Sequence, residues 1–154
     1  MQHRSYKFGG PGGETIPYAI FVPSTYDAAQ PAPLLVSLHG LGRTYDWLMG
    51  YHGMLDLAER DGFVVVTPLG YVRRGWYGTY RSRVTAETAH RSQADVMNVV
   101  GIVRKEFSID PDRVYLWGHS MGGAVAVRTA QKYPSLIAGL ILSAPMLAVK
   151  TEPY

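Results

Sequence analysis

The sequence predicts an α/β fold in which a mostly parallel sheet carries helices on both faces. Two observations lead to this prediction. Short, nearly continuous apolar runs, typical of strands buried on both faces, recur along the chain. Segments with the apolar spacing of amphipathic helices lie between them. The 154 residues correspond to about one domain. No repeat or linker divides them, so residues 1–154 are predicted to form a single domain.

Apolar runs bounded by Pro, Gly or Asp predict most of the strands. The predicted strands are residues 6–8, 18–22, 34–38, 63–66, 114–117 and 140–142. The first two would form a hairpin across the glycine-rich turn at residues 9–13. Helical segments separate the later strands, so we expect these strands to run parallel to one another.

Apolar residues that recur every three or four positions predict three helices. The three segments are residues 48–61, 96–107 and 122–133. Gly50 and Gly53 weaken the first of these helices, because glycine is a poor helix former. Residues 69–91 are expected to form a long loop, and residues 110–112 a turn.

Composition and charge exclude several classes of protein. The chain contains no cysteine, which excludes disulfides, a thiolate nucleophile and thiolate zinc sites. Its formal net charge of +3 is too small to predict nucleic-acid binding, and its apolar runs are too short to span a membrane. The N-terminus leads into no apolar run, so no signal peptide is expected and a cytoplasmic location is the default.

The segment GHSMGG at residues 118–123 predicts the nucleophile of a hydrolase. A predicted strand precedes it and a predicted helix follows it, which is the context of a G-x-S-x-G nucleophile elbow. Ser120 would sit in a strained turn with its hydroxyl above the edge of the sheet. Gly118 and Gly122 would be required because strand and helix nearly touch there. A plain glycine-rich turn or a phosphate cradle is the alternative interpretation.

The segment HGLG at residues 39–42 follows the first long buried strand. In hydrolases with a nucleophile elbow, a loop at that position supplies one N–H of the oxyanion hole, and the residue after the nucleophile supplies the other. We therefore predict that the backbone N–H groups of Leu41 and Met121 form the hole. His39 is expected to order this loop, and a purely structural glycine loop is the alternative.

With these motifs the sequence resembles the α/β-hydrolase superfamily. Residues 110–123 and 16–23 are similar to the prolyl oligopeptidase and esterase branches, and residues 122–145 are similar to monoglyceride lipases and serine aminopeptidases. The resemblance extends over residues 6–147. It implies an α/β-hydrolase fold with a serine nucleophile, and it implies no metal or organic cofactor.

The chain departs from this family on the C-terminal side of the serine. Family members place an Asp or Glu and then a His after the nucleophile. The residues after Ser120 contain no His and a single acid, Glu152. The chain is therefore expected to lack the last strands of the fold and to have an incomplete triad. His90, at the end of the long loop, is the best substitute base, and Glu152 is a candidate orienting acid.

The other histidines are expected to have no catalytic part. His3 lies in a terminus that we expect to be floppy, and His52 lies in a predicted helix where a surface role fits best. His119 is the neighbour of Ser120, but the geometry of an elbow should turn its side chain away from the nucleophile.

The loop at residues 71–83 is rich in Tyr, Trp and Arg. Trp76 and Tyr77 are candidates for a wall of the substrate site, because loops at this edge of a sheet line the ligand crevice. A surface loop whose arginines pair with Glu87 and Asp95 is an equal alternative. Nucleic-acid binding through stacking and phosphate contacts is a further alternative, and we expect no nucleic-acid partner.

The sequence thus predicts a serine hydrolase of esterase or lipase type that acts on a small-molecule ester. One alternative is a hydrolase-fold segment with little turnover that binds a partner or needs a second chain. The other is a serine peptidase of prolyl oligopeptidase type. The uncovered final strand at residues 140–142 predicts a homodimer that covers the sheet edge.

Overall fold

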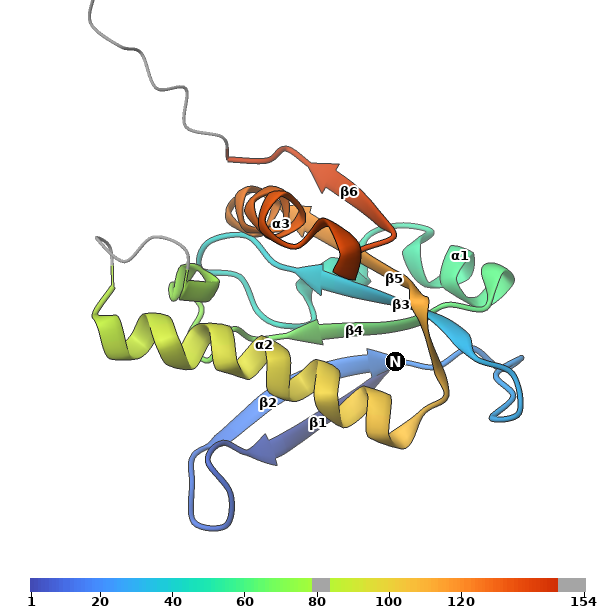
Figure 1. Cartoon of the computed structure of the whole chain (residues 1–154), viewed down its shortest axis with the longest axis horizontal. Helices are drawn as coiled ribbons and strands as arrows, with labels where there is room; N and C mark the ends of the chain where they lie inside the picture. Colours follow the sequence, from blue (N-terminus) through green and yellow to red (C-terminus); the bar gives the residue numbers. More distant parts are fainter. Residues whose placement is uncertain (79–83, 147–154) are drawn as a thin grey trace, which may run out of the picture.

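The computed structural model describes residues 1–78 and 84–146. They form a six-stranded sheet in the order β1-β2-β4-β3-β5-β6 (Figure 1). The strands are β1 Gln2–Lys7, β2 Thr15–Phe21, β3 Ala32–Leu38, β4 Val64–Pro68, β5 Ile109–His119 and β6 Gly139–Ser143. β3 pairs in parallel with β4 and β5, and β5 pairs in parallel with β6, whereas β2 is antiparallel to β1 and β4. The predicted mostly parallel sheet is confirmed.

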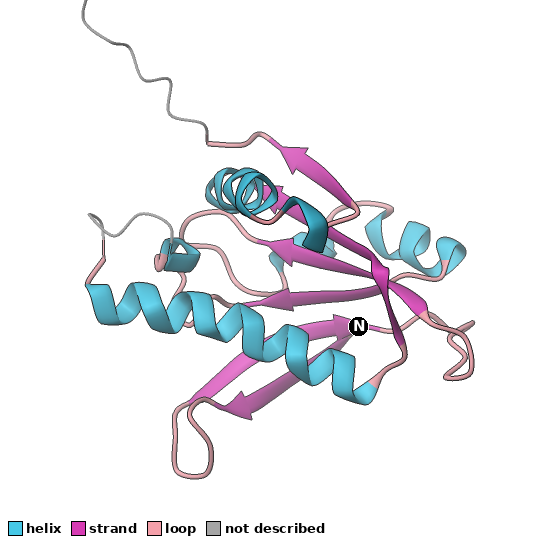
Figure 2. Cartoon of the chain, viewed as in Figure 1, coloured by secondary structure: helices cyan, strands magenta, loops and turns pink. Residues whose placement is uncertain are grey.

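Helices pack on both faces of this sheet, as predicted (Figure 2). They are α1 Met54–Asp61, α2 Ala86–Glu106 and α3 Met121–Lys132, with short 3-10 helices at Trp47–Gly50, Trp76–Gly78 and Pro134–Leu136. α2 and α3 contribute Val103 and Val125 to one core, and α1 contributes Ala58 to the other. Strand β3 divides its side chains between the two cores, because Leu34 faces the first and Leu35 the second.

The central strands are buried on both faces, which explains their continuous apolar runs. Leu34, Val64 and Val66 are fully buried against the α2 and α3 side, and Val65 is fully buried against the α1 side, each with an exposed fraction of 0%. Burial of one such side chain stabilises a fold by about 1.5–3 kcal/mol. The strands therefore form a rigid base for the loops that leave their carboxyl ends.

Two predicted segments have different boundaries in the structure. The helix expected at residues 48–61 is divided into a 3-10 helix and α1. The break lies at Gly53, whose φ of 75° is incompatible with a continuous helix. The turn expected at residues 110–112 is instead part of β5, where the pairing with β3 shifts register between Ala32 and Leu34.

The long loop ends earlier than predicted, because α2 begins at Ala86. Thr85 caps the helix by accepting a hydrogen bond from Thr88 N at 3.1 Å. His90 is therefore a residue of α2 and does not end the loop, and its side chain is exposed. His3 belongs to β1, and His52 lies in the turn before α1, so the expected floppy terminus and helical position were both wrong.

Strand β6 lies at one edge of the sheet and is poorly covered. Leu140, Ile141 and Leu142 have exposed fractions of 37%, 50% and 40%. Large apolar side chains of an edge strand rarely remain this accessible in a monomer.

No helix among the described residues is both long enough and apolar enough to cross a bilayer.

Candidate active site

Ser120 occupies the tight connection between β5 and α3, where the sequence predicts an elbow. Its φ of 52° and ψ of −112° lie outside the regions that a serine ordinarily adopts. Backbone hydrogen bonds hold this conformation: Ser120 N donates to Ser143 O at 3.0 Å, and Ser120 O accepts from Met146 N at 2.9 Å. Strain of this kind persists only where the surrounding structure imposes it, and it clusters at functional sites.

The glycines of the motif leave no room for a side chain. A Cβ atom on Gly118 would lie 2.3 Å from Gly122 O, and a Cβ atom on Gly122 would lie 2.0 Å from Leu38 O. A Cβ atom on Gly123 would lie 2.9 Å from Pro145 Cα. These contacts are with backbone or ring atoms that cannot yield, so strand β5, helix α3 and the end of β3 meet only because these positions are glycine.

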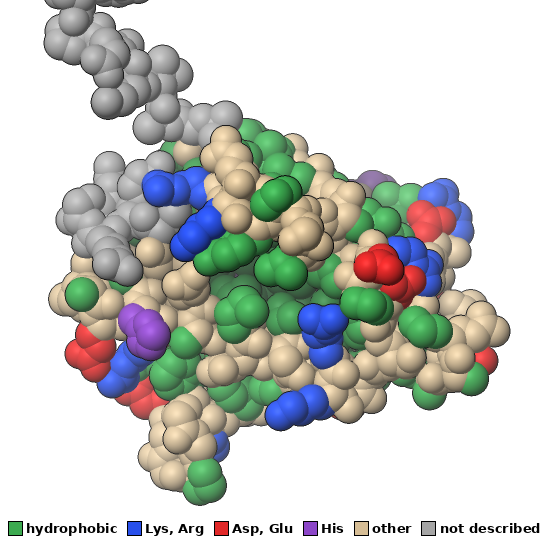
Figure 3. Space-filling model, in the orientation of Figure 1, with side chains coloured by type: hydrophobic (Ala, Val, Ile, Leu, Met, Phe, Trp, Pro, Cys, Tyr) green, Lys and Arg blue, Asp and Glu red, His purple; other side chains and the backbone are tan. Residues whose placement is uncertain are grey.

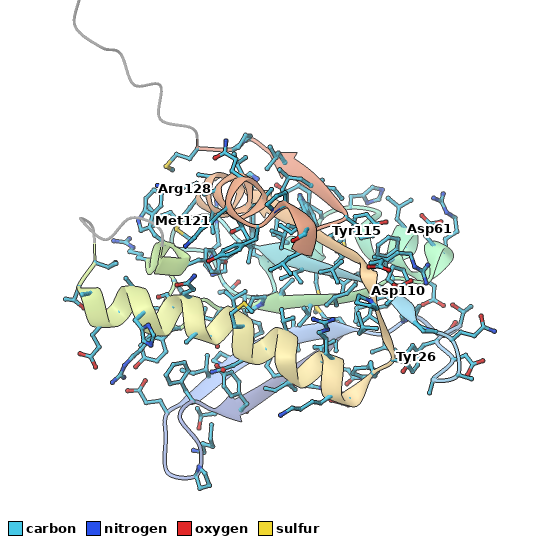
Figure 4. All side chains as sticks on the ribbon, in the orientation of Figure 1. Tyr26, Asp61, Asp110, Tyr115, Met121 and Arg128 are labelled. Atoms are coloured by element: carbon cyan, nitrogen blue, oxygen red, sulfur yellow. The ribbon has the colours of Figure 1, made fainter. Side chains whose placement is uncertain are left out.

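The loop that follows β3 lies directly beside Ser120. The position of a Cβ atom on Gly40 is 3.5 Å from Ser120 Cβ. Arg43 N donates to Gly40 O at 3.1 Å, and Gly42 N donates to Arg73 O at 3.0 Å. Within residues 1–78 and 84–146, no group accepts a hydrogen bond from Leu41 N. Met121 is the first residue of α3, so its N–H precedes the hydrogen bonds of the helix. Figure 4 shows Met121 at the end of the sheet where the parallel strands terminate.

His39 is a buried anchor of this loop. Its side chain is 1% exposed, with Nδ1 at 2.7 Å from Gly40 O and Nε2 at 2.8 Å from Leu69 O. Tyr77 lies against the imidazole and accepts a hydrogen bond from His39 N at 2.8 Å. Burial lowers the pKa of His39, and the nearby charge of Arg73 lowers it further, although the two carbonyl oxygens act in the opposite direction. Both ring nitrogens therefore serve to position the loop.

His119 points away from Ser120, as the sequence predicted. Its Nδ1 lies 3.1 Å from Tyr51 Oη and 3.1 Å from Ser143 Oγ, and its ring stacks edge-on against Trp47. Burial lowers the pKa of His119, and the charge of Arg43 adds to this effect. Within residues 1–78 and 84–146, neither His90 nor any other base makes a hydrogen bond to the Ser120 hydroxyl.

Trp76 and Tyr77 differ from the open substrate wall that the sequence suggested. Their exposed fractions are 4% and 5%, and both belong to the core beneath α2 and α3. Positive φ angles of 53° and 47° turn the chain inward at these residues. Within residues 71–78 of the loop, Val72, Arg73 and Arg74 are the exposed residues. Residues 79–83 of the same loop, and Glu152, lie outside the described residues.

Sequence reasoning missed Asp95, which holds this loop in place. Asp95 is fully buried on α2 and accepts hydrogen bonds from Tyr6 Oη at 2.6 Å, Gly70 N at 2.7 Å and Tyr71 N at 2.8 Å. Burial raises the pKa of this carboxyl group, and the three donors oppose that shift. The signal was present, because Asp95 shares helical spacing with the buried Val99 and Val103. The suggested pairing of Asp95 with an arginine was wrong.

An open pocket of about 570 Å³ lies between the loops that follow β3 and β4. Its lining residues are Gly42, Leu69, Tyr71, Val72, Arg73 and Arg74. Among the described residues, no group of three or more His, Cys, Asp or Glu side chains is placed to hold a metal ion.

The order and direction of the strands, with helices on both faces, match the fold of α/β-hydrolases. An S-formylglutathione hydrolase from Agrobacterium tumefaciens superposes with a TM-score of 0.76 at 22% identity, covering 95% of this chain and 58% of that one. A ferulic acid esterase from Anaeromyces mucronatus superposes with a TM-score of 0.68 at 17% identity, covering 94% and 58%. The shared fold is therefore the α/β-hydrolase fold that the sequence predicted.

Sequence comparison defines the family within this class. A family model described as serine aminopeptidase, S33, matches residues 29–154, and the chain belongs to this α/β-hydrolase family. A bifunctional acetylxylan esterase/xylanase from Neocallimastix patriciarum is 33% identical over 119 residues, which are 77% of this chain and 16% of the relative. The human monoglyceride lipase is 36% identical over 70 residues, 46% of this chain and 22% of the lipase. The chain thus spans less than a third of the length of either relative.

Proposed function

We propose that this chain carries the nucleophile and oxyanion hole of a serine hydrolase that acts on carboxylic esters. The observation that carries the proposal is the backbone of Ser120, held at a φ of 52° between β5 and α3 and beside the loop after β3. The esterase and lipase relatives support the choice of ester substrates.

In the proposed reaction, Ser120 Oγ attacks the carbonyl carbon of the ester and forms a tetrahedral oxyanion. The N–H groups of Leu41 and Met121 donate hydrogen bonds to this oxyanion, and the N-terminal end of α3 adds a favourable dipole. Two preorganised donors of this kind matter greatly, since the loss of one generally lowers the rate about 10²–10³-fold. Collapse of the intermediate expels the alkoxide or phenolate, and the proton of Ser120 passes to solvent. Water then hydrolyses the acyl group left on Ser120.

The reaction requires a base that accepts the proton of Ser120. Within residues 1–78 and 84–146, no base is hydrogen-bonded to the Ser120 hydroxyl. His39 and His119 are committed to Gly40, Leu69, Tyr51 and Ser143, so neither imidazole is poised to accept it. A serine hydroxyl without an adjacent base is a poor nucleophile. We therefore expect slow turnover, confined to esters whose leaving group departs without protonation.

Covalent labelling tests the assignment of Ser120. The chain is incubated with a fluorophosphonate, and the adduct is followed by intact-mass analysis. We expect slow formation of one adduct, its absence in Ser120→Ala, and its persistence in Ser5→Ala, a control at an exposed serine of β1. An adduct that survives in Ser120→Ala would overturn the assignment.

A second candidate is a hydrolase-fold segment that binds its ligand without turnover. It is favoured by the Ser120 hydroxyl, which has no base hydrogen-bonded to it among the described residues. The labelling experiment separates the two proposals, because a site without an activated serine should remain unlabelled.

The family description names aminopeptidases, but amide hydrolysis requires protonation of the leaving amine. We therefore expect no peptidase activity from this chain.

A further inference from the structure

We propose that the substrate carries an anionic oxygen group, a carboxylate or a phosphate, which binds to Arg73 and Arg74 beside the oxyanion loop. This inference rests on the proposed ester hydrolysis at Ser120 and specifies its substrate class. The starting observation is the position of both arginines on the pocket between the two loops, next to Gly42.

Arg73 and Arg74 both lie next to the loop that contains Leu41, Arg73 through its backbone and Arg74 through its side chain. Gly42 N donates to Arg73 O at 3.0 Å, which fixes the two loops to each other. A Cβ atom on Gly42 would lie 3.9 Å from Arg74 Nε, so the head of Arg74 lies beside this loop. The positive charge of Arg73 reaches His39, the buried neighbour of Gly40.

A third positive charge lies on the other side of the same turn. Arg43 follows Gly42 directly, stacks over Trp47 at 4.8 Å from the ring centroid, and acts electrostatically on His119. Arginine forks match the geometry of carboxylate and phosphate oxygens and bind them with two parallel hydrogen bonds. The turn that contains Leu41, one of the two proposed oxyanion donors, is therefore followed directly by Arg43 and lies beside Arg74.

Four carboxylates of the described residues form ion pairs with other arginines, and Glu14 accepts a hydrogen bond from Tyr71, which lines the same pocket. The ion pairs join Arg4 to Glu106, Arg60 to Asp61, Arg91 to Glu87, and Arg113 to Asp110. Within residues 1–78 and 84–146, none of these pairs includes Arg43, Arg73 or Arg74.

Most acidic side chains on the face shown in Figure 3 lie beside basic ones. Asp61 and Asp110 lie at the end of the sheet opposite to Met121 (Figure 4). Arg43, Arg73 and Arg74 thus form no ion pair within the described ranges, and positive charges of this kind attract anionic ligands.

Matched pairs of esters test the proposal. One pair carries the charge on the acyl side, as in a p-nitrophenyl hemisuccinate against its methyl ester. A second pair carries it on the leaving group, as a carboxyphenyl or phosphophenyl acetate against its neutral methyl ester. We expect kcat/KM for at least one anionic member to exceed that of its neutral partner by about tenfold at low ionic strength. The ratio should approach one at about 0.5 M salt, where charges are strongly screened.

Variants locate the effect on the pocket. Arg73→Gln and Arg74→Gln should each reduce severalfold the ratio of kcat/KM for the anionic ester to kcat/KM for its neutral partner. Arg104→Gln, at an exposed arginine in the last turn of α2, is the matched control and should leave the preference unchanged. Labelling of Ser120 by neutral and carboxylate-bearing phosphonates provides a readout that does not need turnover.

The outcomes distinguish the two levels of the proposal. If neutral probes label Ser120 but anionic probes and esters react no faster, the substrate class is wrong and the serine hydrolase assignment stands. If the carboxylate pairs show no preference and the phosphate pair does, phosphate is the recognised group. If no probe labels Ser120, the proposed function fails and the substrate class fails with it.

Discussion

His39 is a buried imidazole whose two nitrogens both face carbonyl oxygens, and this makes the loop after β3 sensitive to pH. A neutral imidazole has one N–H, so it can donate to Gly40 O or to Leu69 O but not to both. The imidazolium could donate to both, yet burial lowers the pKa of His39 below the ordinary 6.5. The cost of burying the charge thus exceeds the gain of the second hydrogen bond.

The sign of the pH dependence follows from this lowered pKa. Below about pH 6.5 the unfolded chain binds a proton at His39 more readily than the folded chain does. The free energy of unfolding should therefore decrease as the pH falls from about 6.5 toward the lowered pKa, by at most about 1.4 kcal/mol per pH unit from this residue. Urea unfolding of the wild-type chain and of His39→Gln across this range measures the effect.

His52→Gln is the matched control for this measurement, because His52 is an exposed histidine in the turn before α1. We expect His39→Gln to reduce the slope, with the remainder coming in part from His119, whose pKa is also lowered, and His52→Gln to retain it. An unchanged slope in His39→Gln would show that another group governs acid stability.

The residual rate tests whether His90 serves as a base. The chain has the proposed nucleophile and oxyanion donors, so hydrolysis of p-nitrophenyl acetate should lie about 10³–10⁴-fold above the reaction in water. His90 is exposed on α2, so His90→Ala should change this rate by less than about tenfold. Brisk turnover that His90→Ala abolishes would instead identify His90 as the base and contradict the expectation of an incomplete triad.

At the scale of secondary-structure elements, the backbones of β3, β5 and α3 lie so close together at their junction that no Cβ atom fits between them. A Cβ atom on Gly122 would lie 2.0 Å from Leu38 O, so Gly122→Ala must separate α3 from β3. We expect it to lower the free energy of unfolding by about 3 kcal/mol or more. Gly101, within α2, has no atom within 4 Å of its Cβ position, and Gly101→Ala should raise stability by about 0.5–1 kcal/mol.

Thermal unfolding of the two glycine variants, compared with the wild type, measures both effects in opposite directions. If Gly122→Ala unfolds at the same temperature as the wild type, the close packing at the elbow is less strict than the backbone indicates.

The elements also show how far the sequence could predict the site. The buried strands and the GHSMGG turn were predictable, because burial on both faces and close backbone approach leave local signatures in residue type. The predicted loop at residues 69–91 overlaps the first residues of α2, which begins at Ala86 after the capping residue Thr85. These first residues are mostly polar and therefore lack the apolar spacing that predicts a helix. Trp76 and Tyr77 were expected to face substrate. Their inward direction depends on positive φ angles and on contacts with His39, which local pattern does not encode.

At the scale of the whole molecule, the edge at β6 predicts self-association. Leu140, Ile141 and Leu142 present apolar side chains on β6, whose outer edge pairs with no other strand of the described residues. A second copy that covers this edge would bury those side chains and pair its backbone groups. Sedimentation at several concentrations should therefore detect a dimer or a larger species.

Ile141→Lys should shift that equilibrium toward the monomer, because a charge on an edge strand opposes pairing. Leu57→Lys, at a 51% exposed leucine of α1, is the control and should leave the equilibrium unchanged. A wild-type chain that stays monomeric at all concentrations would show that the edge is covered within a single copy.

The carboxylate of Asp95 also bears on the order in which the chain assembles. It joins the N-terminal hairpin through Tyr6, the loop after β4 through Gly70 and Tyr71, and helix α2 itself. Contacts between segments so distant along the chain form late in folding, after local structure. The loop that carries Arg73 and Arg74 should therefore order only once the hairpin and α2 have docked. In pulsed hydrogen exchange, the amides of Gly70 and Tyr71 should then become protected later than those of β4. The pocket lined by Arg73 and Arg74 would therefore be among the last parts of the molecule to become ordered.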